Sequence, residues 1–157
     1  MNKTTKQISI QELHDREITE ELLVQVFSAF TCVFEYENID KHIDESMTAY
    51  TGNKKTTYNI EIKEWKGTEN LPKFIWLKKR KLELMKKDKY NDRLIYLMFN
   101  KKRQEAYFFN IDKIDWSKIQ CDLVEQYITE YNKGRGKSYF ETYKIPIKYA
   151  KIYKCHI

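Results

Sequence analysis

Residues 58–65 read Tyr58-Asn59-Ile60-Glu61-Ile62-Lys63-Glu64-Trp65, and this stretch decides the expected fold. Side chains alternate between the two faces of a β-strand. Asn59, Glu61 and Lys63 are therefore expected to project from one face, while the apolar residues between them pack into a core. A carboxylate and an ammonium group would then share one rigid face of a strand.

A hairpin is predicted upstream of this stretch, because Gly52 and Asn53 separate two segments rich in β-forming residues. The incoming strand begins near Asp44, so Asp44 is expected at the same strand edge as Glu61. Asp40 competes with Asp44 for this place. Two carboxylates and a lysine at a strand edge can bind a divalent metal ion and position a water molecule.

Three helices are predicted from apolar spacing and capping signals. Thr19 is a good N-cap for a helix over 20–30, with two acids in its first turn. Apolar residues at helical spacing predict a second helix over 73–87. Ser117 with Gln120 fits a capping box at the start of a third helix, over 118–132.

Further strands are predicted on both sides of these helices. The apolar runs 94–99 and 106–109 are typical of buried strands, and the short polar link between them predicts a hairpin. Segment 31–36 is either a strand or the end of the first helix, and the tail 139–153 is rich in β-formers. The pattern indicates an α/β protein with a mixed central sheet flanked by helices.

The length of 157 residues fits a single domain over 1–157. The net charge of +6 and the pI near 9.0 favour binding to polyanions, of which nucleic acid is the natural one. A solvated surface encoded by an AT-rich genome would have the same composition. Charge therefore does not decide the function.

Three cysteines lie far apart, at positions 32, 121 and 155, without CxxC pairing. This pattern argues against a disulfide framework and a zinc ribbon, and it predicts a cytoplasmic setting. Neither a signal peptide nor a membrane-spanning run is expected from the sequence, so no membrane partner is predicted. The sequence is compatible with a homodimer.

Two basic segments are candidates for contact with a phosphate backbone. The first lies in the predicted second helix and the second is a glycine-containing loop at 133–137. A charge run on a helix is also typical of a solvated face, and the loop also fits a flexible turn. The candidate nucleic-acid-binding residues are Lys78, Lys79, Arg80, Lys133, Arg135 and Lys137.

The order helix, strand, turn, strand bearing Glu61-Ile62-Lys63, helix and buried strand resembles the core of the PD-(D/E)XK nuclease superfamily. The resemblance covers about residues 19–111, whereas the predicted C-terminal helix and β-rich tail at 117–157 add nothing specific to it. Ile43 stands where the name-giving proline would be. A second acid-x-lysine triplet begins at Glu64, but it lacks the strand setting of the first.

The resemblance implies a restriction-endonuclease-like fold and a Mg²⁺- or Mn²⁺-dependent nuclease, acting on DNA by family habit. It makes Asp44 and Glu61 metal ligands and Lys63 the catalytic lysine. An acid on the first helix often supports the metal in this family, which makes Glu21 or Glu20 the third candidate ligand.

Three other interpretations stay open at this stage. Glu61 and Lys63 would also form an ordinary exposed ion pair, which contributes under about 1 kcal/mol. A protein of the same fold could bind nucleic acid without cleaving it. A small basic adaptor or inhibitor could use its charged face to engage another protein.

Overall fold

The structure is a computed structural model that describes residues 10–35, 44–65, 72–86, 93–100, 102–128 and 133–155. Within these residues it is a mixed α/β arrangement of two α-helices and two sheets, α1 over Ile10–Val26 and α2 over Lys79–Lys86. The strands are β1 (Thr31–Glu35), β2 (Glu45–Thr51), β3 (Lys54–Glu64), β4 (Phe74–Lys78), β5 (Arg93–Phe99), β6 (Glu105–Asn110), β7 (Gln120–Tyr127), β8 (Lys137–Pro146) and β9 (Ala150–Lys154).

The larger sheet has six strands in the order β1-β2-β3-β5-β6-β9, and the smaller sheet has three in the order β4-β8-β7. Strands β1, β2 and β3 form an antiparallel meander, whereas β3 lies parallel to β5. Parallel neighbours need a crossover connection, and the segment between β3 and β5 contains β4 and α2. The predicted mixed central sheet is confirmed.

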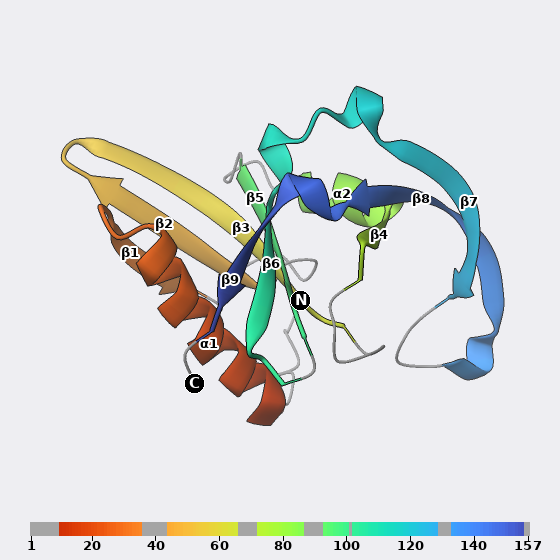
Figure 1. Cartoon of the computed structure of the whole chain (residues 1–157), viewed down its shortest axis with the longest axis horizontal. Coiled ribbons are helices and arrows are strands. Elements are labelled where there is room, and N and C mark those ends of the chain that lie inside the picture. The colour runs from red at the N-terminus through yellow and green to blue at the C-terminus, as the bar shows by residue number, and fades with distance from the viewer. Residues whose placement is uncertain are drawn as a thin grey trace, which may run out of the picture.

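Figure 1 shows α1 on one side of the six-stranded sheet, and α2 and the smaller sheet on the other side, beyond β5 and β6. On one face, Ile18, Leu22 and Leu23 of α1 pack into an apolar cluster with residues of β2, β3, β5 and β6. On the other face, α2 and the smaller sheet share a second apolar cluster with β5 and β6. Because that cluster joins the two sheets, their positions are coupled by the burial of common apolar surface.

The predicted hairpins are both present. Strands β2 and β3 pair around Gly52, whose φ of 55° is the left-handed conformation that glycine adopts at little cost. Strands β5 and β6 pair antiparallel, and β5 is buried along its length after Arg93. The prediction for 94–99 and 106–109 is confirmed, and segment 31–36 contains strand β1.

The alternation predicted for β3 is only partly right. Ile60 is buried on the α1 side as expected, but Asn59 and Glu61 on the opposite face are also buried, at 1% and 6% exposure. The reason is that the crossover covers this second face, a tertiary contact that the local alternation does not reveal. Glu61 is therefore a buried carboxylate and not a surface charge.

The predicted first helix begins too late. Helix α1 starts at Ile10, so Thr19 lies within it, fully buried, and is not its N-cap. The helix ends at Val26, and Phe30 lies outside it. The first two turns carry few apolar residues, so the spacing of apolar positions gave no sign of them.

The predicted second helix is half strand. Residues 74–78 form β4, which pairs with β8, and the helix begins only at Lys79. Ile75 and Leu77 are buried while Trp76 is exposed, which is the alternation of a strand. Pairing with a segment some seventy residues further along the chain overrides the local helical spacing.

The predicted third helix over 118–132 is wrong. Residues 116–118 form a short 3-10 helix, which Asp115 caps by accepting a hydrogen bond from the Ser117 N–H, and the chain then continues as strand β7. Strand β7 pairs with β8 along its whole length. The tail contains β8 and β9, so its predicted β character is confirmed.

Candidate metal and nucleic-acid site

Asp44, just before β2, lies opposite Glu61, which is near the end of β3. The Asp44 N–H donates to the Ile60 carbonyl oxygen at 3.0 Å, and the Ile62 N–H donates to Asp44 Oδ2 at 2.7 Å. These two bonds fix Asp44 to the residues on either side of Glu61. The predicted meeting of the two acids at one strand edge is therefore found in the structure.

The Glu61 carboxyl is strongly affected by its buried surroundings. Its burial, and next the nearby carboxylate of Asp44, raise the pKa of Glu61 to about 7, although the ammonium groups of Lys81 and Lys63 oppose the shift. Its Oε2 atom is buried and has no hydrogen-bond partner among the described residues. A buried carboxylate oxygen without a partner is costly unless a cation or a donor occupies the space beside it.

Two lysines lie beside Glu61. Lys63 is two residues further along β3, hence on the same face, and it is partly buried. Lys81 reaches Glu61 from α2, with 3.2 Å between Nζ and Oε1. Lys81 was missed in the sequence because only the packing of α2 on the sheet brings it to β3. Its place in a lysine-rich run gave no signal that distinguishes it from its neighbours.

Glu21 does not join the two acids. It is exposed on α1, beside Lys154 and Cys155 at the far edge of the six-stranded sheet. Three strands, β3, β5 and β6, lie between that edge and β2. This distance from β2 corrects the prediction that Glu21 is a metal ligand. Successive helix residues point about 100° apart, so Glu20 and Glu21 face different strands.

Glu20, the alternative acid on α1, faces Glu45 of β2. Glu45 is fully buried, and burial first and the Glu20 carboxyl second raise the pKa of Glu45 to about 9. Glu45 pairs with Ile60, so it lies on the α1 face of the sheet, whereas Glu61 lies on the other. A raised pKa keeps Glu45 neutral at pH 7 and makes it a poor metal ligand.

The donor set fits Mg²⁺ in its chemistry but is small. Within the described part of the chain, no group of three or more His, Cys, Asp or Glu side chains is placed to hold a metal ion. Mg²⁺ is often bound by one or two carboxylates and completed by waters and substrate phosphate. Asp44 and Glu61, with the unpartnered Oε2, provide these two carboxylates. Asp40, the other candidate ligand, lies outside the described residues.

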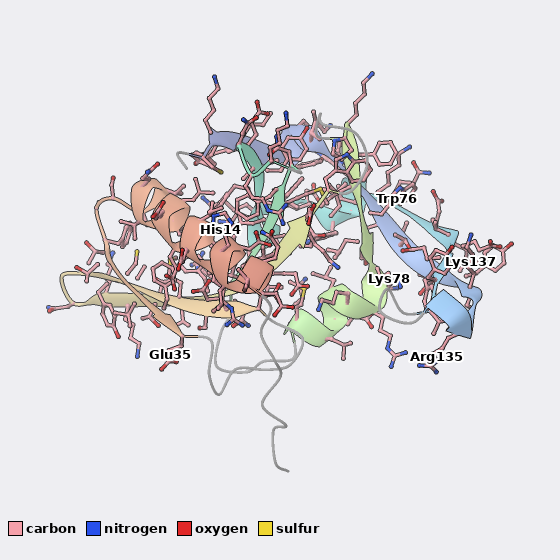
Figure 2. All side chains as sticks on the ribbon, turned by 90° about the horizontal axis from the view of Figure 1, so that it is seen from below. His14, Glu35, Trp76, Lys78, Arg135 and Lys137 are labelled. Atoms are coloured by element: carbon pink, nitrogen blue, oxygen red, sulfur yellow. The ribbon has the colours of Figure 1, made fainter. Side chains whose placement is uncertain are left out.

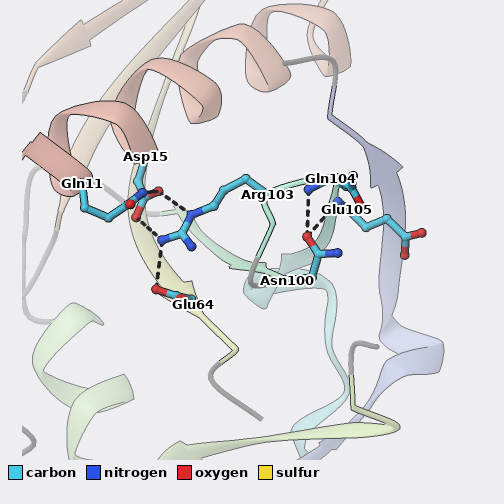
Figure 3. Close-up of polar contacts among 7 residues, drawn as sticks. All are labelled: Gln11, Asp15, Glu64, Asn100, Arg103, Gln104 and Glu105. Atoms are coloured by element: carbon cyan, nitrogen blue, oxygen red, sulfur yellow. Dashed lines mark hydrogen bonds and ion pairs between the residues drawn. The ribbon is translucent and has the colours of Figure 1, made fainter. Parts of the chain in front are cut away.

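An ion-pair network holds the end of β3 in place, as Figure 3 shows. Arg103, between β5 and β6, is paired with Asp15 of α1 (Nε–Oδ1, 2.9 Å) and with Glu64 of β3 (Nη2–Oε2, 2.9 Å). Arg103 is itself buried. Glu64 directly follows Lys63, so the network fixes the backbone next to the candidate site. This role was not predicted, because the three residues are far apart in the sequence.

The first basic segment lines a groove. An open groove of about 400 Å³ lies between α2 and β8 and is lined by Lys78, Lys79, Arg80, Glu83, Leu84, Phe140 and Glu141. Lys79 makes an exposed ion pair with Glu141 at 3.8 Å. Two acids therefore offset part of the charge that the three basic residues bring.

The second basic segment lies at the same end of the smaller sheet. Lys78 donates to the Tyr127 carbonyl oxygen at 3.4 Å, and Lys137 lies over the Tyr127 ring, 4.9 Å from its centroid. Arg135 belongs to a 3-10 helix over Lys133–Arg135, and Figure 2 shows it on the same side of the molecule as Lys78 and Lys137. The structure brings the two predicted segments together, although it does not describe the Lys133 side chain.

Comparison of the chain with protein-family models, with curated proteins and with solved structures finds no match. Among the helices that the structure describes, none is long and apolar enough to cross a membrane. Function is therefore inferred from the residues and their geometry.

Proposed function

We propose that the chain is a Mg²⁺- or Mn²⁺-dependent nuclease that hydrolyses phosphodiester bonds, with DNA as its substrate. The observation that carries the proposal is that two hydrogen bonds hold Asp44 to Ile60 and Ile62, the neighbours of Glu61, while Lys63 lies on the same face as Glu61. An ordinary surface ion pair needs no second carboxylate and no burial.

The order of elements supports a restriction-endonuclease-like fold and membership of the PD-(D/E)XK superfamily. A helix is followed by three antiparallel strands, a crossover that contains a helix, and a fourth strand parallel to the third. The acid-x-lysine element lies on the third strand, β3, next to the parallel partner β5. The order of elements on which the resemblance rests is kept, with strand β1 added before the hairpin and strand β4 added in the crossover.

Each residue of the proposed site has its own role in the reaction. Asp44 and Glu61 would hold the metal ion, which when bound supplies Lewis acidity that activates water and offsets charge on a phosphate. Lys63 donates hydrogen bonds from its ammonium group to the attacking water or to a phosphate oxygen, where negative charge increases in the transition state. The groove at Lys78, Lys79 and Arg80 binds the phosphate backbone.

A second candidate function is a protein of the same fold that binds nucleic acid without cleaving it. The ion pair between Lys81 and Glu61 favours this alternative, because a lysine already compensates the charge of the carboxylate. The protein is proposed to be cytoplasmic under either function, in line with the free thiols of Cys32, Cys121 and Cys155.

A cleavage assay on the wild-type protein distinguishes these functions. Supercoiled, linear and single-stranded DNA are incubated with the protein in Mg²⁺ or in EDTA. A nuclease is expected to cut at least one of them in Mg²⁺ and none in EDTA, because EDTA removes the metal ion. Binding without cleavage of any DNA, or of an RNA tested beside it, would favour the second function.

A further inference from the structure

Aromatic and basic side chains of β4 and β8 lie next to one another on the outward face of the smaller sheet. In β4, Ile75 and Leu77 point into the apolar core, so Phe74, Trp76 and Lys78 lie on the opposite face. In β8, Lys144 pairs with Trp76 and Thr142 pairs with Lys78. Phe140, two residues from Thr142, lies on that face as well.

These side chains contact one another across the two strands. The ring centroids of Phe74 and Trp76 are 5.2 Å apart in an edge-to-face arrangement. Lys144 Nζ lies 4.2 Å from the Phe74 centroid and 5.8 Å from that of Trp76, and Lys78 Nζ lies 4.2 Å from the Phe140 centroid. Trp76 remains 40% exposed, and Figure 2 shows it on the outside of the smaller sheet.

We propose that this face binds single-stranded nucleic acid, with a base stacked on Trp76 and the backbone phosphates on Lys78 and Lys144. Aromatic platforms combined with positive charge are what unpaired bases and their phosphates require. This proposal rests on the proposed nuclease function, because it says which form of nucleic acid the enzyme would act on. Binding itself involves neither Asp44 nor Glu61.

The chemistry of the face favours this ligand over two others. A duplex keeps its bases stacked inside, so it presents no free base to an exposed tryptophan. A protein partner would be expected to meet a contiguous apolar patch, whereas here two ammonium groups lie directly over the rings. The net charge of +6 complements a polyanion.

The test measures the anisotropy of fluorescein-labelled dT20 and of a labelled 20-base-pair duplex with the full chain in EDTA, so that cleavage does not contribute. Stacking on one aromatic side chain contributes about 1–3 kcal/mol, and 1.4 kcal/mol is tenfold in affinity. Trp76→Ala is therefore expected to weaken dT20 binding about tenfold and duplex binding by less than about twofold. Trp76→Phe should retain most of the affinity and shows that the effect is not misfolding.

Tyr139→Ala is the matched control. Tyr139 is an aromatic residue on the same strand as Phe140, 65% exposed, but on the opposite face of the sheet. It should leave dT20 affinity unchanged. Lys144→Gln should flatten the dependence of log affinity on log salt by about 0.7 for each single-strand phosphate that the protein no longer neutralises.

Equal effects of Trp76→Ala and Tyr139→Ala on dT20 binding would overturn the proposal, as would a wild-type protein that does not bind dT20. The failure of this proposal and the failure of the proposed nuclease function give different results. A wild-type protein that binds dT20 through Trp76 but cleaves no nucleic acid supports this surface and removes the nuclease. A wild-type protein that cleaves DNA but binds dT20 equally well without Trp76 supports the nuclease and removes this surface.

Discussion

Replacing Glu61 by glutamine is expected to lower Mg²⁺-dependent cleavage by on the order of 10³-fold while leaving the fold intact. Glutamine keeps the size of the side chain but removes the negative charge that a hard cation needs. Asp44→Asn is expected to have a similar effect, since asparagine still accepts the hydrogen bond from Ile62 N–H and loses only the charge. The measurement is the single-turnover rate on the best DNA substrate.

Two further variants sharpen this prediction. Lys63→Ala should lower the same rate by on the order of 10²-fold or more, because it removes a charged donor near the reacting phosphate. Glu35→Gln, an exposed carboxylate on the edge strand β1, is the control and should cleave at the wild-type rate. Wild-type rates in both Glu61→Gln and Lys63→Ala would show that the site has been assigned to the wrong residues.

Arg103→Met is expected to lower the free energy of unfolding by about 3 kcal/mol, the largest stability effect we predict. The substitution leaves the carboxylates of Asp15 and Glu64 partly buried, at 16% and 27% exposure, without their cation. Breaking a buried ion pair by removing one partner is costly for this reason. Urea unfolding at constant pH and salt measures the change.

The control for this variant is Lys118→Met. Lys118 forms an ion pair with Asp115 at 3.9 Å in which both side chains are largely exposed, so its loss should cost under about 1 kcal/mol. Adding Asp15→Leu and Glu64→Met to Arg103→Met should restore much of the stability, because no uncompensated charge then remains. If Arg103→Met cost no more than Lys118→Met, solvent would be screening the network and it would not fix the end of β3.

The strands near the site could be predicted because their signals are local. The alternation of Glu61 and Lys63 with isoleucines, the Gly52 turn and the apolar run at 94–99 each specify a strand without distant contacts. Together they also predicted that Asp44 and Glu61 meet, since a hairpin register follows from its turn. The burial of Glu61 did not follow, because the covering elements come from the crossover.

Residues 74–78 and 120–127 were predicted as helix, whereas the structure has strands β4 and β7 there. Apolar residues at 74–77 and at 119–127 fit helical spacing as well as strand alternation. Pairing with β8 decides between them, and β8 is distant from β4 in the sequence. Lys81 and Arg103 could not be assigned for the same reason, since each acts on residues that only the tertiary fold brings near.

The most direct test of a metal site at Asp44 and Glu61 measures ligand binding and not activity. A ligand that binds only the folded state stabilises it by RT ln(1 + [L]/Kd), about 2.7 kcal/mol at a hundred times Kd. We expect the melting temperature of the wild type and of the Glu35→Gln control to rise with Mn²⁺, and the rise to be largely absent in Asp44→Asn and Glu61→Gln. The titration is repeated with a short DNA duplex, whose phosphate groups can complete the coordination shell of the metal ion. Equal Mn²⁺-dependent rises in all four proteins, with and without DNA, would contradict the two-carboxylate site.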